Sequence, residues 1–144
     1  MSGEITIASQ GEILRLNALV HDAYLNIREV VYDDHRGQLR LPLRIELPSE
    51  RRFLRRRFVV MREYLVPEHE RLLTVHHVRE YKLRTAAEAE SWDLVNEVTF
   101  KDDSRELLIR CSLAHVFWTK VDSLCVTVLD TGKRFSERRA LSVR

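Results

Sequence analysis

The segment QLRLPLRIEL, residues 38–47, alternates polar and apolar side chains at every position, and this pattern constrains the fold more than any other in the chain. Successive side chains of a β-strand point to opposite faces of a sheet, so the pattern predicts a strand with one buried face and one wet face. Pro42 has no amide hydrogen to donate to a neighbouring strand, so we expect a sheet edge or a bulge there. The buried face would consist of Leu39, Leu41, Leu43, Ile45 and Leu47.

Turn chemistry predicts three β-hairpins. In the first, residues 23–32 precede the alternating strand, and the turn has Asp34 at its first position and Gly37 where a positive φ is needed. Residues 96–113 show the same order of strand, polar turn and strand, which predicts a second hairpin. Residues 115–130 predict a third, and apolar side chains at both alternating sets of positions favour a central place for its second strand.

One helix is expected near the start of the chain, at residues 9–20. Ser9 and Glu12 have the spacing of a capping box, and apolar residues follow at helical spacing. Residues 49–56 are compatible with a second, short helix. The β-branched and aromatic content of residues 57–66 favours a strand over a helix.

These elements predict a mainly β (α+β) single domain, built as an antiparallel sheet or β-sandwich with an N-terminal helix; an up-and-down barrel is the alternative. We place the domain at residues 1–132 and a charged C-terminal tail, frayed or briefly helical, at 133–144. No apolar run approaches the roughly 18 residues of a spanning helix. The start MSGEITIASQ lacks the pattern of a signal peptide, so we expect a cytoplasmic protein without membrane attachment.

Residues 22–41 align without a gap with residues 90–109. Four positions are identical, namely Glu29 with Glu97, Val30 with Val98, Asp34 with Asp102, and Leu39 with Leu107. Two interpretations remain open: an internal duplication, or two hairpins that converge on the same turn chemistry. The alignment fails at the turn itself, because Arg105 stands where the first hairpin has Gly37.

The acidic residues and histidines form no readable catalytic or metal motif. There is no HExxH pattern, and a strand would point the adjacent His76 and His77 to opposite faces. The acids around Asp34 and Asp102 could share a cation only if the two hairpin tips converge, and they lack the frame of an EF-hand. Four glycines leave few places for backbone to approach a phosphate. We therefore expect no enzymatic activity, no metal and no cofactor.

The segment ERRFLRRRF, residues 50–58, is the strongest local feature. Its arginines are Arg51, Arg52, Arg55, Arg56 and Arg57. Arginines interleaved with aromatic side chains can contact phosphates and stack on bases. The competing interpretation is a solvated basic face that pairs with acids on neighbouring strands.

The net charge of +2 identifies no class of partner. We expect a small cytoplasmic, noncatalytic interaction module whose partner is another protein or a second copy of the chain. The alternative is binding of nucleic acid or another polyanion through residues 51–57. Self-association would favour the first function, and salt-sensitive binding of an oligonucleotide would favour the second.

Overall fold

The computed structural model describes residues 3–46, 52–57, 61–86 and 89–143. Within these ranges, eleven strands form one antiparallel sheet, accompanied by one α-helix, α1 (Ile13–Val20), and two short 3₁₀ segments. The predicted mainly β fold with an N-terminal helix is confirmed.

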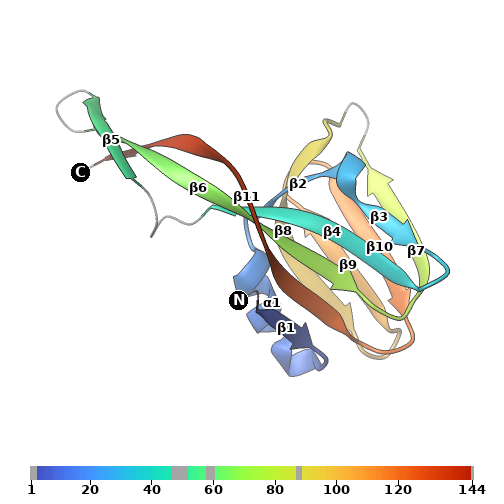
Figure 1. Ribbon diagram of the computed structural model, residues 1–144. Coiled ribbons are helices and arrows are strands. Elements are labelled where there is room, and N and C mark those ends of the chain that lie inside the picture. Colours follow the sequence, from blue (N-terminus) through green and yellow to red (C-terminus); the bar gives the residue numbers. More distant parts are fainter. Residues whose placement is uncertain (1–2, 47–51, 58–60, 87–88, 144) are drawn as a thin grey trace.

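The strands are hydrogen-bonded in the order β1-β11-β6-β4-β2-β8-β9-β10-β7, with β3 added to β4 and β5 added to β6 (Figure 1). Their bounds are β1 Glu4–Ile7, β2 Tyr24–Asn26, β3 Val31–Asp33, β4 Gln38–Glu46, β5 Arg52–Arg57, β6 Met61–Val75, β7 Val78–Thr85, β8 Trp92–Lys101, β9 Glu106–Cys111, β10 His115–Val121 and β11 Val126–Val143. The 3₁₀ segments are η1 Gln10–Glu12 and η2 Ile27–Glu29.

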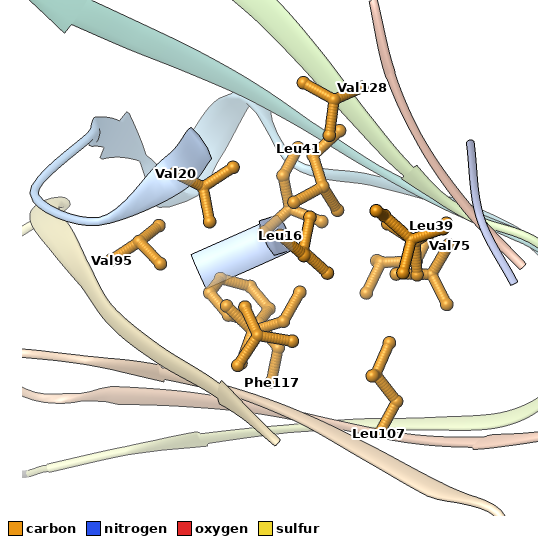
Figure 2. Packing of buried hydrophobic residues seen from close by; sticks show 14 of the residues in the cluster. Leu16, Val20, Leu39, Leu41, Val75, Val95, Leu107, Phe117 and Val128 are labelled. Carbon is orange, nitrogen blue, oxygen red and sulfur yellow. The ribbon is translucent and has the colours of Figure 1, made fainter. Parts of the chain in front are cut away.

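The sheet folds over so that its two halves face each other and enclose the core. One half contains β1, β11, β6 and β4, the other contains β8, β9, β10 and β7, and the short strand β2 joins them. Figure 2 shows Leu41 and Val128 of the first half pointing toward Phe117 and Leu107 of the second. All four side chains are at most 3% exposed, and burial of such apolar surface is the main term that stabilises the fold.

Helix α1 packs on this core through one apolar stripe. Ile13, Leu16 and Val20 are buried, as their helical spacing predicts. Asn17 attaches the helix to β8, because its side-chain amide donates to the Val98 carbonyl at 2.8 Å and accepts from the Val98 amide at 2.7 Å. These two bonds satisfy both the backbone amide and the backbone carbonyl of Val98.

The helix begins with a variant of the predicted capping box. Glu12 Oε1 accepts from the Ser9 hydroxyl at 3.0 Å and from the Ala8 amide at 3.3 Å. The Ser9 side chain makes no bond to the first-turn amides, so only the acidic half of the box is formed. The 3₁₀ turn η1 lies between Ser9 and the first residue of α1.

Strand β4 confirms the alternating pattern as far as Leu43; Ile45 is only half-buried, and Leu47 lies outside the described residues. Leu39, Leu41 and Leu43 are fully buried. The expectation of an edge at Pro42 is right only locally. β4 pairs with β6 along one side, but on the other side β3 stops at Arg40 and β2 meets only Arg44. Pro42 therefore falls in the gap between β3 and β2, where the chain makes the 3₁₀ segment η2 and the ladder needs no donor.

The third predicted hairpin, at residues 115–130, is wrong. β10 pairs with β9 and β7, whereas β11 pairs with β1 and β6, so residues 122–125 carry the chain from one half of the sheet to the other. The apolar pattern of two strands does not determine which partner each one takes. The first two hairpins are confirmed as β3–β4 and β8–β9.

Two other expectations change because the segments concerned pair with β6. Residues 52–56, which we considered as part of a short helix, belong to strand β5, paired with β6; residues 49–51 lie outside the described residues. Residues 133–143, which we expected to form a charged tail, continue β11 and pair with β6 down to Met61.

The two aligned hairpins have the same geometry. Both enclose a four-residue turn in the same register, with Asp33 opposite Gln38 in the first and Lys101 opposite Glu106 in the second. The last turn residue adopts a left-handed conformation in each, with φ of 62° at Gly37 and 55° at Arg105. Turn chemistry alone would produce this likeness, so a common origin of the two segments stays a prediction.

Candidate polyanion-binding arm

Three strands extend beyond the two-layer body as an arm, visible at the upper left of Figure 1. We define the arm as β5, residues 61–66 of β6 and residues 136–143 of β11. β6 is the central strand, with β5 on one side and β11 on the other. β6 and β11 contain 15 and 18 residues, and at about 3.3 Å per residue they are long enough to cross the body and continue past it.

The arm gathers arginines from three separate stretches of sequence. It contains Arg52, Arg55, Arg56, Arg57, Arg62, Arg138 and Arg139. Of the predicted cluster, only Arg51 lies outside the described residues. Sequence reasoning missed the contributions of β6 and β11, because nothing local to the segment SERRAL (136–141) shows that it returns to the neighbourhood of β5.

The strand register brings the arginine positions close together. Arg56 is opposite Arg62, while Arg52 and Arg139 are both opposite Leu65 from either side. Adjacent strands lie about 4.8 Å apart, so the backbones of positions two strands apart are separated by roughly 10 Å. Only two acidic residues, Glu63 and Glu137, accompany the seven arginines in the arm.

The arm is therefore the basic part of an almost neutral chain. The whole chain has 24 basic and 22 acidic residues, so the residues outside the arm number 17 basic and 20 acidic. This distribution differs from a basic surface spread evenly over the molecule. A concentrated positive potential on a projecting element attracts anionic partners to that element.

The root of the arm is held by stacked side chains. The Arg44 guanidinium of β4 lies 3.8 Å from the ring centroid of Phe135 on β11 and 4.8 Å from that of Trp92 on β8. Arg44 also lies 3.6 Å from a carboxylate oxygen of Glu29. Such cation–π contacts are worth about 0.5–2 kcal/mol each, and here they join both halves of the sheet to the strand that enters the arm.

The β6–β11 ladder is interrupted where the arm leaves the body. The register shifts twice, between Asp130 and Arg134 and again between Phe135 and Arg138, and Gly132 adopts a φ of 77°. The Asp130 carboxylate accepts from the Gly132 amide at 2.9 Å, and the Thr131 hydroxyl donates to the Glu70 carboxylate at 3.0 Å. Bulges of this kind change the direction of a strand, which accounts for the departure of the arm from the plane of the body.

A buried hydrogen bond between an aspartate and a histidine, which sequence reasoning did not single out, joins β8 to β10. Asp93 and His115 are 1% and 3% exposed, and His115 Nδ1 lies 2.7 Å from Asp93 Oδ2. The same carboxylate accepts backbone amides on both oxygens. Oδ1 accepts from Leu94 and Leu113 at 2.7 and 2.9 Å, and Oδ2 accepts from Ala114 and His115 at 2.9 and 3.1 Å.

The electrostatics of Asp93 point to a structural role. Burial raises its pKa, but the hydrogen bonds from His115 and from the amides of Ala114, Leu113 and Leu94 outweigh burial and leave the pKa below its usual value. The ionised carboxylate therefore closes the turn between β9 and β10. The four described cavities are lined by other residues.

The other histidines and acids that we weighed make only local contacts. His76 and His77 lie between β6 and β7 and not within a strand, with their ring centroids 6.3 Å apart. His76 Nε2 lies 2.9 Å from the Thr127 hydroxyl, and burial, followed by the neighbouring His77, lowers the pKa of His76. Asp34 is exposed and lies 3.9 Å from His35 within its own turn. Across the described residues, no three His, Cys, Asp or Glu side chains are grouped so that they could hold a metal ion.

In the described part of the chain, no helix combines the length and apolar character needed to cross a membrane.

Comparisons with known proteins assign no family to the chain. No protein-family model, no curated protein and no solved structure matches the sequence or the fold significantly.

Proposed function

We propose that this protein is a noncatalytic binding module whose arm binds a polyanion, with single-stranded nucleic acid as the preferred class. The observation that carries the proposal is the gathering of seven arginines and two glutamates on a three-stranded arm, in a chain whose remaining residues are net acidic. Arginine contacts phosphates in a bidentate manner and releases counterions when it does so.

The arm also carries aromatic residues at neighbouring positions. Phe53 on β5 is opposite Tyr64 on β6. Proteins that bind single strands without sequence preference combine a basic track for the backbone with aromatic rings on which bases stack, each stack being worth about 1–3 kcal/mol. A β-sheet arm with both residue types supports single-stranded over double-stranded nucleic acid.

Self-association is the second candidate function. Within the described pairings, the outer edges of β5 and of residues 136–143 of β11 have no neighbouring strand. Unpaired edges are templates for a strand from another chain. Charge repulsion between two arms with this excess of arginine opposes such pairing, and we therefore rank it below polyanion binding.

The test is fluorescence anisotropy of a labelled single-stranded oligonucleotide, measured against protein concentration at several salt concentrations. For single strands, the slope of log K against log salt is about −0.7 per phosphate contact. If the arm is the site, replacement of Arg55 and Arg56 by Ala should make the slope less steep by up to about 1.4. Replacement of Arg138 and Arg139 should have a similar effect, although these residues lie some 80 positions away in the sequence.

The matched control removes two exposed arginines of the body, Arg28 and Arg110. It lowers net charge as much as the arm variants do, so it should leave the slope almost unchanged if the arm is the site. Equal weakening in all three variants would indicate nonspecific attraction and refute a localised site. Absence of binding at low salt, together with a dimer in sedimentation equilibrium that the arm variants disrupt, would favour self-association instead.

A further inference from the structure

A second basic site lies at the end of the body away from the arm, near the start of β11 (Figure 1). The β8–β9 turn, the beginning of β7 and the end of β10 surround a pocket of about 360 Å³. It is lined by Arg79, Asp103, Ser104, Arg105, Lys120, Val121 and Asp122. This volume lies at the lower end of the range for small-molecule sites.

The residues that line the pocket carry three positive and two negative charges, and Lys120 also stands opposite Glu80 and Glu106 on the neighbouring strands. Arg79 lies 2.6 Å from the Asp122 carboxylate, which neutralises both groups. Asp103 accepts the Ser104 amide through Oδ1 at 2.8 Å and so serves its own turn. The Lys120 ammonium group has no carboxylate partner among the described residues, and Arg105 donates to a backbone carbonyl, that of Asp122, and not to an acid.

The pocket also contains an unsatisfied polar atom. The Ser104 hydroxyl oxygen is buried and has no hydrogen-bond partner among the described residues. A buried hydroxyl without a partner is destabilising by about 1–3 kcal/mol relative to a satisfied one, and such atoms are few in native proteins. The oxygen has no surface open to the pocket, so the Ser104 side chain would have to rotate before it could meet a ligand there.

The backbone of Arg105 gives an independent indication. The equivalent position of the first hairpin is Gly37, and glycine adopts the left-handed conformation without strain. The second hairpin places an arginine there, at a φ of 55°. Backbone strain of this kind persists where the side chain has a role that stability alone does not explain. The Arg105 side chain lines this pocket and also the adjacent one of about 280 Å³.

We propose that this pocket binds the phosphate group of a small phosphomonoester, held by Lys120 and Arg105, with the Ser104 hydroxyl as a further donor once its side chain has rotated toward the ligand. The pocket is larger than a bare phosphate ion requires, and the neighbouring cavity beside Arg105 offers room for the organic part. This site is separate from the arm and does not depend on the function proposed for it.

The experiment is a titration of ¹⁵N-labelled protein with glycerol 3-phosphate at constant ionic strength, followed by backbone amide shifts. We expect saturable shifts at Ser104, Arg105 and Val121, and weaker saturation by inorganic phosphate; glycerol alone should cause none. Lys120→Gln should weaken binding about tenfold or more, as expected for loss of one charge-assisted hydrogen bond. The control Lys101→Gln removes one positive charge from an exposed residue of the β8–β9 hairpin that does not line the pocket. It should leave the affinity unchanged.

Arg105→Gly separates ligand binding from folding. Glycine relieves the backbone strain, so the variant should stay folded with a Tm close to or above that of the parent protein, yet it should lose most of its affinity for glycerol 3-phosphate. Non-saturating shifts, or equal weakening by Lys120→Gln and Lys101→Gln, would overturn the proposal. Unchanged affinity in a folded Arg105→Gly protein would also overturn it.

Discussion

Replacement of Asp93 by Asn tests whether this buried carboxylate organises the second half of the sheet. The substitution preserves shape but exchanges one oxygen for an NH₂ group. In one orientation the NH₂ faces Ala114, His115 and the imidazole, which are the donors to Oδ2; in the other it faces the amides of Leu94 and Leu113. In either orientation, the NH₂ group would therefore face at least two buried N–H donors where the carboxylate offered them an acceptor.

The expected loss of stability is large. A hydrogen bond to a charged group contributes about 1.5–3 kcal/mol, and a buried donor left without an acceptor is destabilising by about 1–3 kcal/mol. Because the bonds share one carboxylate, their contributions do not add, and we expect Asp93→Asn to lower the free energy of unfolding by about 3–5 kcal/mol. That is a large part of the 5–15 kcal/mol typical of a domain.

Urea denaturation followed by circular dichroism measures this loss. The control is Asp102→Asn, which changes an exposed turn acid and should alter the free energy of unfolding by no more than about 0.5 kcal/mol. A loss below about 1 kcal/mol in Asp93→Asn would refute the reasoning, since it would mean that the amides of residues 113–115 find other acceptors.

The remaining predictions concern acid, the turn glycines and a buried thiol. The pKa of Asp93 is lower in the folded state than in the unfolded state. The stability that the ionised carboxylate contributes is therefore complete above the unfolded value of about 3.9 and is lost as pH falls through the folded value. Acid titration should destabilise the parent protein more steeply than Asp93→Asn. Gly37→Ala should be more destabilising in urea than Gly132→Ala: both have positive φ, but a Cβ at Gly37 would lie 3.0 Å from the Val78 carbonyl oxygen, whereas Gly132 has open space. Burial, followed by the charge of Asp93, raises the pKa of Cys111 to about 12, so at pH 8 its alkylation by iodoacetamide should be slow in the native protein and fast in urea; fast native reaction would contradict the burial.

Local patterns were sufficient where a segment's structure depends on its own residues. The alternation around Leu41 defines a strand with one buried face whatever its partners are, and the spacing of Leu16 and Val20 defines the buried stripe of α1. The turn signal at Gly37 likewise identified a hairpin, and the observed φ of 62° supplies its physical reason.

Pairing between distant segments could not be predicted in this way. Residues 115–121 and 126–130 read as two adjacent strands, but each pairs with other partners on opposite halves of the sheet. The candidate site shows the same limit. The arginines of β5 were visible as a cluster, but the register that adds Arg138 and Arg139 to them depends on pairing with Val66 and Leu65, more than 70 residues earlier in the chain.

The sequence by itself determined the class of fold, the first two hairpins and the N-terminal helix, because side-chain periodicity and turn chemistry act over a few residues. Tertiary structure alone decided that the sheet folds over its own core and that β6 and β11 continue into a basic arm. It also decided that Asp93 meets His115 and that Lys120 and Arg105 line the same pocket. Strand partners and clusters of charge are set by which distant surfaces bury most apolar area together, and this quantity is a property of the whole chain.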